Sequence, residues 1–217
     1  MSDFAARRRQ MVDSEIRPSD ITDYPIIEAF LTVPREMFVP AARRELAYLG
    51  ESLTLDGGRA LPPPRVLGKM LEALSLEPSD LVLDIGCASG YSTAIIARLA
   101  EAVVGVECDE SLAAEADALM TEIGADNAVI VAGELTAGAP RHAPFDAIIL
   151  QGAIETLPET LTDQLAEGGR IAAIFAEGAL HVCRIGRKHD GAVSWRFAFS
   201  SGAPVLPGFA RTPGFVF

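Results

Sequence analysis

Hydrophobic and polar residues follow one spacing in the first third of the chain and another spacing afterwards. Before residue 80, apolar positions recur three or four residues apart, which is typical of amphipathic helices. Helices are expected at 3–17, 23–33 and 41–49, and in the run that follows Pro64. Pro18 should stop the first of them, and Pro25 suits the first turn of the second. This part of the chain is therefore predicted to be helical.

From Asp80 onward, short apolar runs alternate with longer helical patterns. Strands are expected at 81–86, 102–107, 128–133, 145–152 and 168–176, and helices at 91–100, 109–124 and 158–166. The runs 181–187 and 193–200 flank Asp190-Gly191, a pair that favours a hairpin turn. Strands that alternate with helices form parallel sheets. The sequence therefore predicts an α/β fold, a Rossmann-like, doubly wound and mostly parallel sheet with an antiparallel C-terminal edge and an N-terminal helical cap.

The composition suits one compact unit and narrows the possible partners. The chain has 217 residues, of which 49% are hydrophobic and 22% are charged, and its formal net charge is −12. Such negative charge repels phosphate backbones, so no nucleic-acid partner is expected. No apolar run is long enough to span a bilayer, and Cys87, Cys108 and Cys183 have no metal-like spacing. We therefore expect reduced thiols, a cytoplasmic location and no membrane partner.

The first strand, turn and helix read LDIGCASGYS and contain the strongest chemical signal. Asp84, Gly86 and Gly90 form the pattern D-x-G-x-x-x-G, which differs from the G-x-G-x-x-G of dinucleotide-binding loops. One glycine permits a tight turn, and the other lets the backbone approach a ligand. The carboxylate of Asp84 stands where a dinucleotide site would not favour negative charge, but it suits a ligand with an ammonium and a sulfonium group. These properties favour S-adenosylmethionine as the cofactor.

Two further acids follow the next strands at spacings that suit the same ligand. Glu107 lies 23 positions after Asp84, where an acid can accept hydrogen bonds from both ribose hydroxyls. Glu134, or the backbone beside it, could contact the adenine amino group after the third strand. Each acid alone is equally well explained as a solvated carboxylate at a strand end. A nicotinamide-dependent dehydrogenase is the rival interpretation of the whole pattern.

Several blocks of the sequence resemble the protein-L-isoaspartate O-methyltransferase family. They are QMVDSEIRPSDITD, VPREMFVP, AYLGESLTL, VLDIGCASGYSTAIIARLA, GADNAVIVAGE, HAPFDAIIL and LAEGGRIAAIF, within residues 10–176. The resemblance implies an S-adenosylmethionine-dependent enzyme that esterifies isoaspartyl carboxylates in damaged proteins, so the expected substrate is a protein or peptide. It divides the chain into a cap with a substrate loop, 1–64, and a cofactor-binding methyltransferase domain, 65–217. The final stretch APVLPGFARTPGFVF matches no family ending.

The resemblance also implies which residues bind the cofactor, and they follow the ends of the first four strands of the domain. The expected set comprises Asp84, Gly86, Cys87, Ser89, Gly90, Glu107, Cys108, Glu134, Leu135 and Gln151. The glycine loop would line the methionine part of S-adenosylmethionine, Glu107 the ribose and Glu134 the adenine. Gln151, Ile154 and Glu155 depart from the small, alanine-rich run of the family, so they would put a different surface beside the methyl group.

The sharpest departure from the family lies at 57–63, where the family reads close to G-Q-T-I-S-Q-P. In the family this loop closes over the substrate, and its serine lies near the methyl-accepting carboxylate. Here Leu61 takes the serine position and Pro62 the glutamine position, and the three consecutive prolines supply no N–H donors. The missing hydroxyl should cost about ten- to a hundred-fold in rate without abolishing it. Arg59 is either a compensating clamp for a carboxylate or a surface charge, and the segment is either a rebuilt lid or a connector.

Other functions are left open or disfavoured by particular features. The altered loop is compatible with a methyltransferase that has a different acceptor, or with a catalytically weak relative that binds the cofactor and acts as an interaction module. A nucleic-acid amino-methyltransferase would need a P-P-[YFW] turn after the fourth strand, where LQGAIE stands instead. His142, His181 and His189 show no grouping with acids in the sequence, so no metal is expected. The sequence leaves the oligomeric state open.

Overall fold

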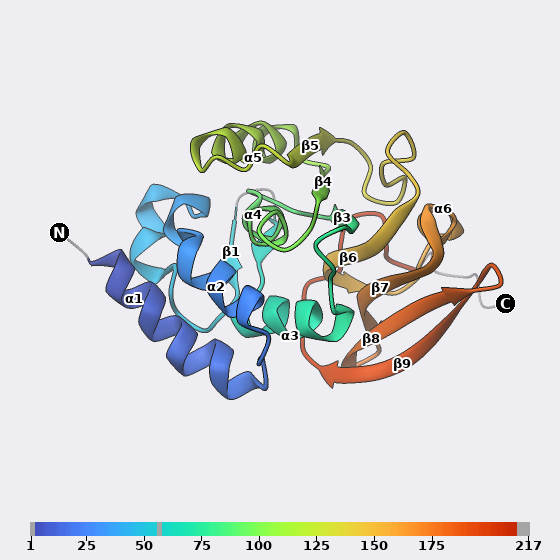
Figure 1. Cartoon of the computed structure of the whole chain (residues 1–217), viewed down its shortest axis with the longest axis horizontal. Helices are drawn as coiled ribbons and strands as arrows, with labels where there is room; N and C mark the ends of the chain where they lie inside the picture. Colours follow the sequence, from blue (N-terminus) through green and yellow to red (C-terminus); the bar gives the residue numbers. More distant parts are fainter. Residues whose placement is uncertain (1–2, 56–57, 212–217) are drawn as a thin grey trace, which may run out of the picture.

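The computed structural model describes residues 3–55 and 58–211 and is built around a seven-stranded sheet (Figure 1). The helical cap, coloured blue to cyan, lies at one side of the molecule, and the last three strands lie at the other side. The strands of the sheet are β3 (Leu81–Ile85), β4 (Ala102–Glu107), β5 (Ala128–Ala132), β6 (Phe145–Ile154), β7 (Leu165–Glu177), β8 (Leu180–His189) and β9 (Ala192–Ser200). Their order is β5-β4-β3-β6-β7-β8-β9.

The sheet confirms the predicted fold class. The strands from β5 to β7 pair in parallel, whereas β8 and β9 form an antiparallel hairpin at one edge. The hairpin turns at Asp190 and Gly191, both of which have positive φ angles, as the Asp-Gly pair predicted. A separate antiparallel pair, β1 (Leu53–Thr54) and β2 (Ala60–Leu61), lies in the substrate-loop region.

The N-terminal cap is helical, but not every segment is an α-helix. It contains α1 (Phe4–Met11), the π-helix η1 (Val12–Ile16), the 3₁₀ turn η2 (Arg17–Ser19), α2 (Tyr24–Thr32), and the 3₁₀ helices η3 (Arg35–Phe38) and η4 (Ala41–Leu46). The first helical stretch continues past Pro18, because the first turn of η2 does not need the N–H that proline lacks. The helix expected at 3–17 thus changes from α to π at Val12, and the helix expected at 41–49 is the 3₁₀ helix η4.

The remaining helices cover the two faces of the sheet, and alternate residues of β3 point to opposite faces. These helices are α3 (Pro64–Leu74), α4 (Tyr91–Ile96), α5 (Glu110–Glu122) and α6 (Glu159–Asp163). Val82 belongs to the core cluster that contains residues of the cap, α3, α4 and α5, whereas Leu83 belongs to the one that contains Leu161 of α6 and Phe209. In the described part of the chain, no helix has the length and apolar character needed to cross a membrane.

Two of these helices, α6 and α4, are shorter than the sequence predicted. The helix α6 was expected to reach residue 166. It ends at Asp163, and β7 begins two residues later. The carbonyl of Gln164 accepts the backbone N–H of Phe145, so this residue already belongs to the contact between the two strands. Sheet pairing therefore overrides the helical pattern here. Similarly, α4 ends at Ile96 and is followed by a turn rather than continuing to residue 100.

The strand order places a ligand crevice at the carboxyl ends of β3, β4 and β6. β3 lies between β4 and β6, so the chain leaves it in one direction for β4 and β5 and in the other for β6 and β7. Ligands of doubly wound sheets bind at such a reversal of strand order. Ile85 is paired with Val106 on one side and Leu150 on the other. The residues that follow these three, Gly86, Glu107 and Gln151, therefore meet at one edge.

Candidate active site

The glycine loop after β3 has the tight geometry that its sequence predicted. Gly86 and Gly90 have φ angles of 76° and 92°, and Ala88 between them also has a positive φ of 52°. The backbone N–H groups of Gly86 and Cys87 both donate to the carbonyl of Val106, at 2.8 and 3.2 Å, which fixes the loop to β4. A side chain at Gly86 would meet two neighbours, since an added Cβ would lie 2.7 Å from Nη2 of Arg59 and 3.0 Å from Cδ2 of Leu206. Only glycine fits this position.

Asp84, the acid of the glycine-loop motif, is fully buried and faces other side chains of the protein. Its Oδ2 accepts hydrogen bonds from the hydroxyls of Ser92 and Thr93, at 2.6 and 2.7 Å, and its Oδ1 accepts one from Nε2 of Gln151 at 2.7 Å. Burial raises the pKa of Asp84 above its usual value, although these three hydrogen bonds oppose the shift. Asp84 therefore positions neighbouring groups at the start of α4 and the end of β6.

Gln151 has one polar atom that the described residues leave free. It is 6% exposed, its Nε2 is bonded to Asp84, and its Oε1 has no hydrogen-bond partner among the residues that the structure describes. Gln151 lines two small cavities, of about 20 and 10 Å³, which also border the loop that contains Arg59 and Pro62. A buried acceptor without a donor is costly unless a ligand supplies the hydrogen bond. This oxygen is therefore a candidate contact for a bound molecule.

Glu107 receives hydrogen bonds from both sides of the crevice. Its carboxylate accepts the backbone N–H of Ala88 at 2.7 Å, of Cys108 at 2.8 Å and of Asp109 at 3.1 Å. The acid at the end of β4 is thereby joined to the glycine loop, as expected for a pair of elements that share one ligand. Glu107 itself is fully buried, so it is not the solvated strand-end carboxylate that the sequence alone allowed.

Arg59 lies against Glu107, so its interpretation as a surface charge was wrong. The guanidinium is 5% exposed, and its Nε and Nη2 each lie 3.1 Å from a carboxylate oxygen of Glu107. Nη2 also donates to the carbonyl of Gly86 at 2.8 Å. Burial alone would raise the pKa of Glu107, but the hydrogen bonds and positive charge of Arg59, together with backbone N–H groups, hold it below its usual value. Arg59 of the loop is thus hydrogen-bonded to the carboxylate that is predicted to bind the ribose of the cofactor.

The substrate loop is held by buried contacts rather than by solvent-exposed ones. Leu61 is 3% exposed and pairs with Leu53 in the small β1–β2 sheet, and it also belongs to the core cluster of the cap. The carbonyl of Pro62 accepts a hydrogen bond from Nη2 of Arg35 at 2.8 Å. These contacts fix the described part of the segment in place, and the lid and connector interpretations both stay predictions. Gly57, the first residue of the predicted loop, lies outside the described residues.

Arg35 is a positioning residue that the sequence analysis did not single out. It is 1% exposed, its Nε donates to the carbonyl of Ala47 at 2.8 Å, and its guanidinium lies 4.6 Å from the ring centre of Tyr91. Together with the bond to Pro62, these contacts connect the cap, the loop and α4. The signal for it was present in VPREMFVP, one of the blocks that carry the family resemblance, where Arg35 lies between Val33 and Phe38, both of which are buried.

The C-terminal segment folds back over the crevice, which the sequence could not predict. The N–H of Ala153 donates to the carbonyl of Pro204, and the N–H of Leu206 donates to the carbonyl of Ala153, each at 2.8 Å. The Leu206 side chain is 2% exposed and lies over both Gly86 and Gly152. Residues near the C-terminus thus complete one wall of the candidate site.

The other predicted cofactor residues lie around the same edge, in different surroundings. The hydroxyl of Ser89 donates to the carbonyl of Phe38 in the cap at 2.7 Å, so its hydrogen is already used. Cys87 is buried, and burial raises the pKa of its thiol well above the usual value, whereas Cys108 is exposed. Leu135 is buried beside Gly86, and Glu134 is exposed. The structure thus places all of them near the crevice without testing their roles.

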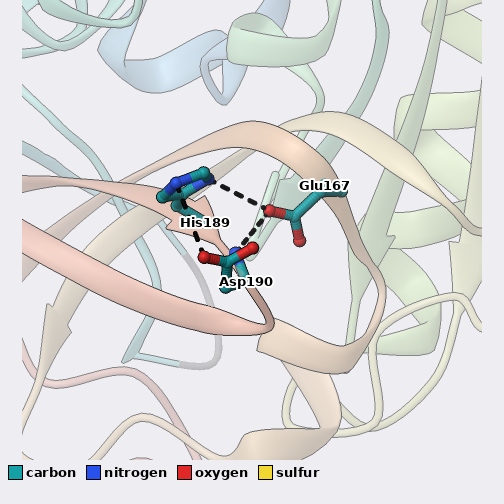
Figure 2. Close-up of side chains that lie close together, drawn as sticks. All are labelled: Glu167, His189 and Asp190. Carbon is teal, nitrogen blue, oxygen red and sulfur yellow. Dashed lines mark hydrogen bonds and ion pairs between the residues drawn. The ribbon is translucent and has the colours of Figure 1, made fainter.

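One group of acids and a histidine lies away from the crevice (Figure 2). Nδ1 of His189 lies 3.5 Å from Glu167, and Nε2 of the same ring lies 3.6 Å from Asp190. His189 thus has acidic neighbours that the sequence analysis did not single out, but they do not lie at the crevice. The three side chains are exposed, and Glu167 accepts the N–H groups of Asp190 and Gly191 in the hairpin turn. Since β8 ends beside the start of β7, the group lies at the opposite edge of the sheet from the crevice.

The fold and the crevice define the class of protein before any relative is considered. A doubly wound sheet with a glycine loop after β3 and a buried acid at the end of β4 is the Rossmann-like arrangement for a nucleotide-containing cofactor. The model of one family, described as protein-L-isoaspartate(D-aspartate) O-methyltransferase, matches residues 6–200. The chain belongs to this family, and the match extends the resemblance seen at 10–176 through the β8–β9 hairpin.

Individual relatives agree with this assignment. A protein-L-isoaspartate O-methyltransferase from Roseiflexus castenholzii is 37% identical over 211 residues, which cover 97% of this chain and 96% of the relative. A solved protein-L-isoaspartate O-methyltransferase superposes with a TM-score of 0.83 at 24% identity, over 93% of this chain and 66% of that one. A protein from Plasmodium falciparum, described as a putative member of the family in complex with S-adenosyl-L-homocysteine, gives a TM-score of 0.79 at 20% identity, over 95% and 99%. The two structures support the methyltransferase fold.

Proposed function

We propose that this protein is an S-adenosylmethionine-dependent methyltransferase that esterifies the carboxylate of isoaspartyl residues in damaged proteins. The observation that carries the proposal is the family match over residues 6–200, which includes the glycine loop, Glu107, Gln151 and the substrate loop. Family membership brings with it both the cofactor and the acceptor. The departures at Leu61 and Pro62 leave the crevice and its polar groups in place.

The residues at the crevice fit S-adenosylmethionine in chemistry. Glu107 would hold the ribose hydroxyls, and Oε1 of Gln151 is a free acceptor for an N–H group. Asp84 would act through Gln151, because its own oxygens already accept three hydrogen bonds. Arg59 must move away from Glu107 for this binding mode. S-adenosylmethionine supplies a methyl group on a positively charged sulfur, and its transfer to a carboxylate oxygen leaves a methyl ester.

Methyl transfer to a carboxylate requires the protein to orient the acceptor and to exclude water from the site, but it does not require a general base. A carboxylate acceptor is ionised at neutral pH, since free carboxyl groups have pKa values of about 4, so no proton has to be removed. The rate then depends on holding the acceptor in line and on excluding water. The buried loop residues Leu61 and Pro63 and the C-terminal residue Leu206 exclude water from the crevice.

The proposed partners and location follow from the remaining features. A protein or peptide with an isoaspartyl residue is the substrate, and the net charge of −12 disfavours nucleic acids. The three cysteines lie in the described part of the chain and are all free thiols. This pattern supports a reducing compartment, and we place the protein in the cytoplasm.

The product of the reaction gives a direct test. Purified protein is incubated with S-adenosylmethionine and a peptide that contains one isoaspartyl residue, and the peptide is then analysed by mass spectrometry. The expected result is the mass gain of a single methyl group, which mild base removes because a carboxyl methyl ester hydrolyses readily. A methyl group that resists base, or no gain while the cofactor is bound, would contradict the proposed acceptor and direct the search to another one.

A further inference from the structure

Arg59 and a ribose would compete for the same carboxylate. Glu107 accepts three backbone N–H groups, from Ala88, Cys108 and Asp109, and two N–H groups from Arg59. A carboxylate has about four lone-pair positions, so these donors saturate it. The diol of a ribose also presents two donors. The cofactor can therefore bind Glu107 only by replacing the guanidinium.

We propose that Arg59 is exchanged between two carboxylates in the course of binding. Arg59 pairs with Glu107 until the ribose hydroxyls of the cofactor replace it as hydrogen-bond donors to Glu107. The guanidinium then binds the acceptor carboxylate in the adjoining cavity. The inference rests on the proposed function, because it assigns a residue to the binding of that same cofactor and acceptor. Arg59 is thus a substrate-binding residue that only the cofactor-loaded protein makes available.

The cavity next to Arg59 has the properties that the second position requires. It holds only about 20 Å³ in this structure and must widen to admit an acceptor, and Arg59 is the one charged residue among the described residues that line it. Gln151 lies in the same wall and has a free Oε1 that can accept a backbone N–H of a peptide. Arg59 already borders both this cavity and Glu107, so the guanidinium needs to turn about its own side chain rather than carry the loop with it.

The exchange also gives a role to Arg59, which stands at a loop position where the family motif has threonine. Arginine binds a carboxylate through two parallel N–H groups, which orients the acceptor more firmly than one hydroxyl. Leu61, at the position of the family's serine, has its side chain in the core and offers no polar group. A buried guanidinium without a partner is unfavourable, so displacement of Arg59 is completed when an acidic acceptor arrives. Cofactor and acceptor should therefore strengthen each other's binding, and by the same factor.

The test measures binding rather than turnover. The affinity of the wild-type protein for an isoaspartyl peptide is measured by calorimetry with and without saturating S-adenosylhomocysteine. The same peptide with that carboxylate converted to an amide serves as the ligand control. We expect S-adenosylhomocysteine to increase affinity for the acidic peptide by about tenfold or more and to leave the amide unaffected. Equal strengthening of both peptides, or of neither, would overturn the proposal.

An Arg59→Met variant separates the two roles of the guanidinium. It should bind S-adenosylhomocysteine about tenfold more tightly, because the competitor is gone, and should lose the strengthening of peptide binding. Arg65→Met is the matched control, since Arg65 also pairs with an acid but is half-exposed and lies at the start of α3. It should behave as the wild type does. Unchanged or weaker cofactor binding in folded Arg59→Met protein would contradict the exchange, and failure of the wild type to bind S-adenosylhomocysteine would instead refute the proposed function.

Discussion

Gln151 and Asp84 are joined across the crevice by a hydrogen bond of 2.7 Å from Nε2 to Oδ1, although they lie 67 positions apart in the chain. The bond fixes the amide so that its Oε1 lies at the wall of both cavities. Ser92 and Thr93 hold the other oxygen of Asp84. The buried acid of the glycine-loop motif is therefore a support for a ligand-facing amide at the end of β6.

Replacement of Gln151 should affect both stability and binding. In Gln151→Leu, Asp84 keeps its burial but loses one donor, so we expect the free energy of unfolding to fall by about 1–3 kcal/mol. The KM for an isoaspartyl peptide should rise, because Oε1 is lost from the cavity. Gln164→Leu provides the comparison, since Gln164 is also buried and hydrogen-bonded but supports the region of α6. The Gln164→Leu variant should lose a similar free energy of unfolding, measured in urea, while keeping the wild-type KM. An equal rise in KM in both variants would argue against a ligand contact at Gln151.

The Arg59–Glu107 pair should give stability a characteristic dependence on pH. Its contribution is complete at neutral pH, above the pKa of an unfolded glutamate, and is lost as pH falls through the lowered folded pKa of Glu107. Arg59→Met leaves the buried Glu107 without its cation, so at pH 7 we expect a loss of about 3–5 kcal/mol. In the variant the pKa of Glu107 rises, and protonation relieves the unpaired charge as pH falls.

The difference in unfolding free energy between the two proteins should therefore shrink from pH 7 to pH 4. The raised pKa of Asp84 acts with the opposite sign, and it cancels in the comparison to the extent that the substitution leaves Asp84 undisturbed. Urea unfolding of both proteins across this range is the measurement. A difference that stays constant with pH would mean that the pair does not hold the pKa of Glu107 down.

Restoring the family's serine should not restore activity. Leu61 is buried in the core cluster that the cap shares with the sheet, so Leu61→Ser removes apolar contacts and buries a hydroxyl. We expect the free energy of unfolding to fall by about 2–4 kcal/mol, with no increase in kcat for an isoaspartyl peptide. Thermal unfolding and initial rates measure the two effects. A clear gain in kcat would show that the hydroxyl, and not Arg59, is what this loop lacks.

Arg35 should control the placement of the loop rather than the cofactor. Arg35→Met removes the donors to the carbonyls of Pro62 and Ala47, so we expect a loss of about 2–4 kcal/mol in stability. The loop should become more accessible to protease, and the KM for the peptide should rise more than the Kd for S-adenosylhomocysteine. Limited proteolysis measures the accessibility of the loop, and the peptide KM and the Kd for S-adenosylhomocysteine show which ligand is affected more. An equal weakening of both ligands would place the effect on the whole fold.

Local signals in the sequence predicted the sheet and the part of the site that the sheet positions. The pattern after Asp80 indicated the strands, and parallel pairing then brings the residues after β3, β4 and β6 together. Gly86 and Glu107 followed from their spacing, whereas Gln151 came from the family resemblance. Such features depend on residues close in the chain and on a rule of sheet geometry. They can therefore be read without a structure.

Long-range contacts are the part that the sequence could not supply. Arg59 reaches Glu107 across 48 positions, and Leu206 reaches Gly86 from the C-terminal segment. Nothing in the local pattern of GGRALPPPRV distinguishes a surface arginine from a buried one. Burial depends on which segment the folded chain lays over the crevice. The end of α6 was predicted wrongly for a similar reason, since pairing of β6 with β7 decided where that helix ends.

The central claim is that the acceptor is an isoaspartyl carboxylate, and its most direct test is a comparison of kcat/KM for three peptides. These are an isoaspartyl peptide, the matching aspartyl peptide, and the isoaspartyl peptide with that carboxylate converted to an amide, each assayed with labelled S-adenosylmethionine and scored for base-labile label. We predict transfer to the first peptide and none above background to the other two. Equal transfer to the aspartyl peptide, or no transfer to any of them by protein that binds the cofactor, would contradict the account.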